Sequence, residues 1–155
     1  MTREEIMGLT GRELDFAVGR EVMGYSVYHY DKSNNDYYLL WDREGNPVFS
    51  LWVTGGVIDR GQRDTESEAW ADTPKYTIDA NALRDMEAAI QSSEIKFLQN
   101  YYLLNLLEIL DTESEPGYWR NTSQGVSLEC LVLVRFASPT DCCRAALLAV
   151  TEAQK

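Results

Sequence analysis

The pattern of apolar and polar residues changes its period several times along the chain. Apolar positions spaced by three or four residues predict an amphipathic helix, whereas strict alternation predicts a strand. Helical spacing follows Thr10, follows Thr77 or Asp79, extends from Glu94 to Leu110, and resumes after Ser138. We therefore expect four helices. The third is apolar nearly all round, which is typical of a helix buried on more than one side or covering a partner.

Polar residues at the expected helix ends support this interpretation. Thr10 and Glu13 have the spacing of a capping box, in which each side chain bonds a backbone amide of the first turn. Ser138 precedes Pro139, and proline is favoured at the first helical position. Gly24 suits the position that follows the first helix, where a positive φ is cheap only for glycine.

Aromatic and β-branched residues predict strands in four places. The segment 42–47 is rich in turn-forming residues, so we expect strands 37–41 and 48–53 to pair as an antiparallel hairpin. Residues 54–75 show no periodicity, and we expect a long loop of the kind that is functional or disordered. The expected strands are 25–30, 37–41, 48–53 and 126–136, the last of them central because it becomes fully apolar.

Composition narrows the possible partners. The 155 residues are enough for one domain, which we expect to span 1–155. They include 25 acidic and 14 basic residues, a net charge of −11. Duplex DNA and anionic membranes both repel such a surface, so neither is an expected partner. The cysteine count is odd and forms no C-x-x-C pair, which indicates reduced thiols in a cytoplasmic protein.

The sequence offers little for catalysis. His29 is the only histidine, and we expect it to be a half-exposed strand residue rather than a catalytic base. One histidine and three cysteines do not have the spacing of a zinc site, and the acidic stretch 64–72 lacks the pattern of a calcium loop. We therefore expect no enzyme, no cofactor and no metal.

Aromatic residues are the positive signal, with four tryptophans and nine tyrosines in the chain. Their rings offer flat faces for stacking on a base, while phosphates require arginine or a helix N-terminus. Packing in the core is the alternative explanation for most of these rings. The candidate ligand-binding residues are Trp41, Trp52, Trp70, Tyr76, Thr77, Asp79, Trp119 and Arg120.

Three segments carry a resemblance to a known family. They are LTGRELDFAVGREVMG at 9–24, PKYTIDANAL at 74–83 and CCRAALLAV at 142–150. Together and in this order they resemble the phage ABA sandwich domain family. The match is inexact, since Tyr25 stands where the family usually has tryptophan and Thr77 where it has serine. The resemblance implies a phage origin and a three-layer α-β-α sandwich with a mainly antiparallel or mixed sheet.

The resemblance and the aromatic residues suggest one leading hypothesis and one alternative. The leading hypothesis is a phage anti-defence protein in the host cytoplasm that sequesters a nucleotide immune signal, such as a cyclic ADP-ribose derivative, without catalysis. It would act as a homodimer or higher homo-oligomer, with 94–110 as the interface. The alternative is an acidic interaction module that inhibits a basic host protein. Turnover of the bound nucleotide would instead indicate an enzyme.

Overall fold

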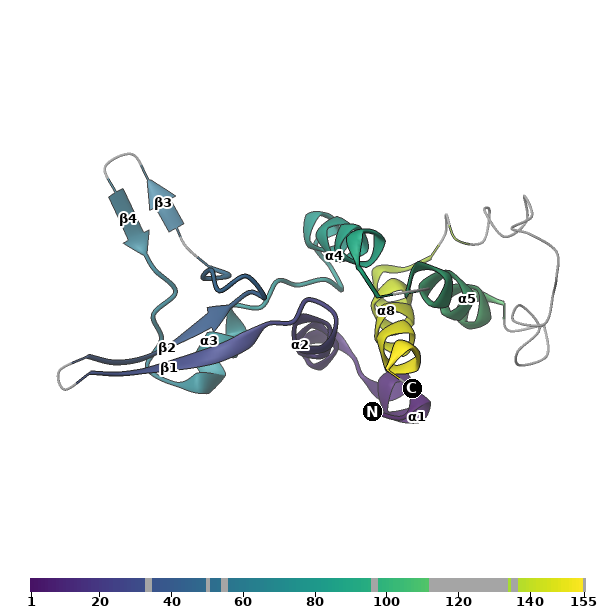
Figure 1. The fold of residues 1–155 in the computed structure, drawn as a ribbon, viewed down its shortest axis with the longest axis horizontal. Coiled ribbons are helices and arrows are strands. Elements are labelled where there is room, and N and C mark those ends of the chain that lie inside the picture. The colour runs from purple at the N-terminus through teal and green to yellow at the C-terminus, as the bar shows by residue number, and fades with distance from the viewer. Residues whose placement is uncertain are drawn as a thin grey trace.

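A computed structural model describes residues 1–32, 35–49, 51–53, 56–95, 98–111, 134 and 137–154, and only the backbone course of 32, 35, 51–53 and 56–59. Within this part of the chain, a body of helices and a projecting β arm lie side by side (Figure 1). The body contains α1 (Arg3–Gly8), α2 (Gly11–Glu21), α4 (Ala80–Ser92), α5 (Leu98–Leu110) and α8 (Pro139–Ala153). The arm contains β1 (Ser26–Lys32), β2 (Asn35–Trp41), β3 (Leu51–Val53), β4 (Gly56–Asp59) and α3 (Glu66–Ala71).

The expected three-layer α-β-α sandwich is wrong, because the structure is mostly helical. Among the described residues the strands form two separate antiparallel pairs, β1 with β2 and β3 with β4. A sandwich needs a sheet covered by helices on both faces. Here the main cluster of buried apolar side chains comes from helices and adjoining loops, and the buried Leu39 and Leu40 of β2 lie outside it. The expected central strand 126–136 lies, but for Val134, outside the described residues.

Helix α8 lies at the centre of the body, between α2 and α5 (Figure 1). Its alanines are fully buried, at 0% exposure for Ala145, Ala146 and Ala149. Small side chains let neighbouring backbones approach closely. Helix α8 contacts α5, α2, α1 and α4. Large apolar residues of these helices, among them Ile6, Leu14, Met86, Leu106 and Leu147, fill the core around α8.

The helix caps agree with the sequence at three ends and disagree at one. Ser138 and Asp141 form a capping box on α8, and Asp79, rather than Thr77, caps α4. Gly24 has the expected positive φ of 73°. The capping box expected at Thr10 is wrong, because its side chain makes no cap hydrogen bond.

The strand pairing differs from the expected hairpin. β1 pairs with β2 over its whole length, from Ser26 opposite Trp41 to Lys32 opposite Asn35. The segment after β2 does turn back, since the Asp42 side chain accepts from the amide of Asn46. It then makes only an isolated bridge between Trp41 and Pro47, so the expected ladder between 37–41 and 48–53 is wrong.

The expected loop over 54–75 is also wrong in two places. Residues 56–59 form β4, and residues 66–71 form α3. Thr65 and Glu68 make a full capping box at the start of α3. That S/T-x-x-E spacing is visible in the sequence and is the signal that identifies this helix.

Stacked rings stabilise the hairpin of β1 and β2. Tyr28, Tyr30, Tyr37 and Trp41 lie on one face, since alternate residues of a strand share a face. Tyr30 stacks on Tyr37 at 5.1 Å between ring centroids, and Tyr28 stacks on Trp41 at 5.2 Å. Cross-strand aromatic pairs of this kind are a main source of stability in a sheet that has few strands.

Candidate functional site

A buried carboxylate joins the arm to the body. Asp15 of α2 is only 1% exposed and accepts a hydrogen bond from the amide of Thr77 at 2.9 Å. Arg12, one turn earlier, forms an ion pair with Asp15 at 3.3 Å. The Arg12 guanidinium also donates to the carbonyls of Thr73 and Ala71. Helix α2 therefore fixes the segment in which the chain returns from the arm.

The segment in which the chain leaves the body and enters the arm is fixed at the same junction. The amide of Tyr25 donates to the carbonyl of Gly19 at 2.8 Å, and the Tyr76 hydroxyl donates to that of Tyr25 at 3.1 Å. Burial raises the pKa of both phenols above the usual value. Both hydroxyls are thus neutral donors and acceptors at neutral pH, and they tie the two ends of the arm together.

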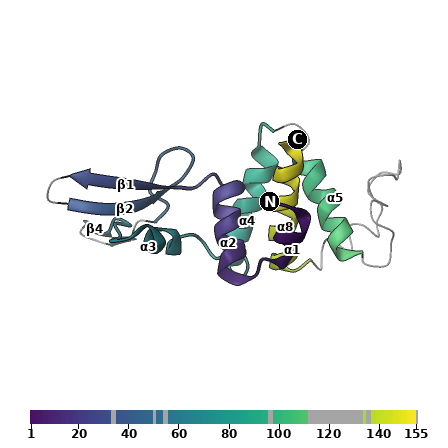
Figure 2. The same cartoon turned by 90° about the horizontal axis from the view of Figure 1, so that it is seen from below.

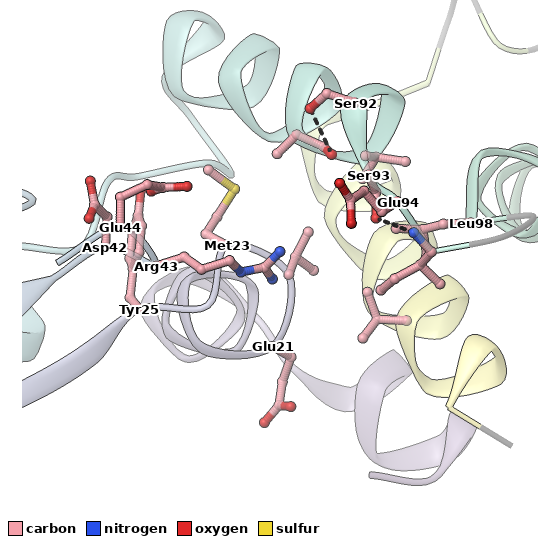
Figure 3. A pocket seen from close by; sticks show the side chains of 15 residues that line it. Glu21, Met23, Tyr25, Asp42, Arg43, Glu44, Ser92, Ser93, Glu94 and Leu98 are labelled. Carbon is pink, nitrogen blue, oxygen red and sulfur yellow. Dashed lines mark hydrogen bonds between the residues drawn. The ribbon is translucent and has the colours of Figure 1, made fainter. Parts of the chain in front are cut away.

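A cavity of about 740 Å³ opens at this junction (Figure 3). Its apolar wall comes from the body, and the turn that follows β2 closes the opposite side. Such a volume is in the range of pockets that hold small molecules or single side chains. The apolar residues that line it are Val22, Met23, Ala89, Ile90, Ile95, Leu98 and Val150.

Negative charge dominates the rim of this junction cavity. The lining includes four carboxylates, those of Glu21, Asp42, Glu44 and Glu94, against a single cation, Arg43. The C-terminal end of α4 also lies in the wall, and its last turn contains no basic residue. A helix C-terminus carries partial negative charge. The cavity therefore favours a cation over an anion.

Arg43 shows how a guanidinium fits at this place. Figure 3 shows its side chain extending from the arm into the cavity, with Asp42 and Glu44 near its base. The Arg43 Nε atom would lie 2.9 Å from a Cβ added at Gly24, a contact that a shift of the flexible Arg43 side chain would relieve. The positive φ of 73° at Gly24 is what favours glycine over other residues there.

Three of the predicted site residues lie in the junction, where each already has structural contacts. Tyr76 is 1% exposed and packs in the core, so its ring is covered. The backbone amide of Thr77 donates a hydrogen bond to the Asp15 carboxylate. Asp79 accepts from the amides of Asn81 and Ala82 as the cap of α4.

The two tryptophans whose side chains the structure describes, Trp41 and Trp70, make ring contacts with different partners. Trp41 stacks on Tyr28 in the arm, and its buried Nε1 atom has no hydrogen-bond partner among the described residues. Trp70 lies on α3. Trp52 lies in β3, where only the backbone course is described, and Trp119 and Arg120 lie outside the described residues.

Trp70 contributes to a second hollow of about 520 Å³, between α3 and α2. Its ring lies 6.5 Å from that of Phe16, and Arg20 completes the lining with Glu66 and Ser67. Arg20 also forms an exposed ion pair with Glu21 at 2.8 Å. One ring pair and one guanidinium are the elements that a nucleotide base and phosphate would require.

The other potentially reactive groups among the described residues are buried or in contact with neighbouring side chains. Cys142 and Cys143 are free and buried, and burial raises the pKa of Cys143 to about 12, so neither is an activated thiolate. His29 contacts Asp36 and stacks on Tyr38. No cluster of three or more potential metal ligands occurs among the described residues. None of the described helices combines the length and apolarity needed to cross a bilayer.

No protein-family model, curated protein or solved structure matches the chain. The resemblance to the phage ABA sandwich domain family therefore stays a prediction.

Proposed function

We propose that this protein is a non-catalytic acidic interaction module that binds a basic segment of a partner protein. The observation that carries the proposal is the junction cavity, whose lining combines four carboxylates, one of them paired with Arg20, and a single arginine with an apolar wall. An arginine or lysine of the partner would place its charged end at the rim. Its alkyl stem would lie on the apolar wall, as long basic side chains do on apolar surfaces.

The charge of the whole chain supports the same partner class. A net charge of −11 attracts basic surfaces at long range and speeds their encounter. A partner that uses the same basic segment to bind nucleic acid would be inhibited by this module. The cavity then supplies a defined contact within a broad electrostatic attraction.

The test is the binding of a fluorescently labelled oligo-arginine peptide, followed by anisotropy at low and high salt. The double variant Glu44→Gln/Glu94→Gln removes two exposed carboxylates of the cavity, and we expect it to weaken binding by about tenfold. The matched control Glu4→Gln/Asp64→Asn removes two exposed charges outside the cavity lining and should weaken binding much less. Equal loss in both variants, or no binding by the native protein, would refute the proposal.

A second candidate function is sequestration of an adenine-containing nucleotide, favoured by the hollow that Trp70, Phe16 and Arg20 line. The base would stack on Trp70 and a phosphate would contact Arg20. Calorimetric titration with cyclic ADP-ribose tests this function. A heat of binding that is lost in Trp70→Ala and retained in Trp41→Phe supports the sequestration function. No heat of binding with the native protein excludes cyclic ADP-ribose as the ligand.

A further inference from the structure

The outer edge of β1 has no strand beside it among the described residues. β1 has one neighbour among the described strands, β2, and in the view of Figure 2 β4 and α3 lie on the side of β2 away from β1. The far side of β2 is in use, since Tyr38 forms a bridge with Arg63 and the amide of Val48 donates to the carbonyl of Leu40. The hairpin can therefore gain a strand only beside β1.

β1 lacks most of the devices that usually prevent strand addition. Proteins protect an edge with charged side chains, proline, a bulge or a very short strand. Of these, β1 has only the charges of Asp31 and Lys32, at the end of the strand. The sequence of β1, SVYHYDK, contains no proline, and its seven residues pair with β2 in an unbroken register. An exposed backbone edge of this length is a template for another strand.

Charge and chemistry favour a second copy of this chain as the added strand. β1 contains one acid, Asp31, and one base, Lys32, so it is neutral in a chain of net charge −11. Pairing at this edge therefore brings together two strands that carry no net charge. Tyr28 is 49% exposed, and pairing would cover it with an aromatic residue of the other copy.

We propose that two copies associate through antiparallel pairing of their β1 strands, which gives a four-stranded sheet in the order β2–β1–β1–β2. The register with full overlap places His29 opposite His29 of the second copy and Tyr28 opposite Tyr30. This register stacks a tyrosine pair on each side of the two-fold axis and sets Asp31 opposite Val27, so no like charges meet at neutral pH. A sheet of four strands is also more stable than an isolated hairpin.

The interface is small, so the dimer forms and dissociates with concentration. Sedimentation of the native protein over a range of concentrations should show monomer and dimer in exchange. Tyr28→Lys places a charge on the strand and should weaken the dimer at least about tenfold, because edge lysines block strand addition. The control Ile78→Lys alters a side chain outside the edge that is more accessible than Tyr28, 76% against 49% exposed, and should leave dimerisation unchanged.

Cross-linking tests the register. In a Cys130→Ser background, His29→Cys should form a disulfide-linked dimer on mild oxidation, because residues opposite each other on paired strands lie within disulfide range. Asp64→Cys in the same background should not. A native protein that stays monomeric overturns the inference, as does a dimer that Tyr28→Lys leaves intact or that His29→Cys fails to trap. Peptide binding at the junction cavity is measured separately and does not depend on these outcomes.

Discussion

In the helical body, apolar side chains from five helices meet in one core around α8, whereas the arm is held by stacked rings and backbone hydrogen bonds. Among the described apolar side chains of the arm, only Leu39, Leu40 and Ala69 are buried. Regions with few buried contacts open locally at lower free energy than the core of the same protein. The body should therefore set global stability, and the arm should open without unfolding the body.

A substitution that creates a cavity in the core of the body tests this comparison most strongly. Leu147 of α8 is 0% exposed, and Leu147→Ala should lower the free energy of unfolding by about 2–5 kcal/mol, measured by urea denaturation. Leu40→Ala, its counterpart in the arm, should instead reduce amide protection in 26–41 and leave the main transition in place. Equal shifts of the same transition would show that the two regions unfold as one.

The joint between the two regions gives the next largest effect. Asp15→Ala leaves the amide of Thr77 and the guanidinium of Arg12 without their carboxylate, and we expect a loss of about 2 kcal/mol. Amide exchange should also show faster opening of 71–77. Asp85→Ala, an exposed substitution on α4, serves as the control and should change stability by less than about 0.5 kcal/mol.

Alkali should destabilise the helical body, because its buried groups keep their protons only in the folded state. The pKa of Cys143 is raised to about 12 in the folded state from a usual value of 9.0. Between these values the unfolded chain has lost the proton that the folded chain keeps, so stability is complete below pH 9 and falls as pH rises. One such group contributes a slope of at most about 1.4 kcal/mol per pH unit. Burial raises the pKa of Tyr76 and Tyr102 too, which adds to the fall.

Denaturation at a series of pH values checks this prediction. Cys143→Ala should be less stable than the native protein at neutral pH, because it leaves a small cavity, but its stability should fall less steeply above pH 9. Parallel curves for the two proteins would contradict the assignment of this titration to the thiol.

The smallest expected effect concerns the ring stack of the arm. Tyr37→Ala removes the ring that stacks on Tyr30 and should cost about 1 kcal/mol, seen as faster amide exchange in β1 and β2. Tyr37→Phe keeps the ring and should retain most of the protection. A change in the unfolding of the body with Tyr37→Ala would show that the arm contributes to global stability.

Local signals in the sequence predicted the helices better than the pairing of strands. The caps at Asp79 and Ser138 and the positive φ at Gly24 depend on residues close in sequence, and all are confirmed. The hairpin was assigned to the wrong partner because turn-forming residues follow β2. The segment before β2 matches it over seven residues and brings Tyr30 onto Tyr37, and only the folded chain shows that competition.

The candidate site was harder to predict, because a cavity depends on elements distant in sequence. Aromatic content directed attention to rings, yet Tyr76 became core and Trp41 and Trp70 lie apart in the arm. The acids of the junction cavity, such as Glu21 and Glu94, come from segments more than seventy residues apart along the chain. The net charge of −11 was the available signal, but it does not say where the acids gather.

The adjacency of Tyr25 and Tyr76 has a consequence for how this chain can vary. A segment whose two ends meet is topologically an insertion, since its removal leaves ends that a short linker can reconnect. Helices before and after it would still pack on α8, because that packing involves no residue of the inserted stretch. The helical body can therefore keep its fold while the inserted arm varies in length and sequence. Such variation would change the surface that the arm presents to a partner.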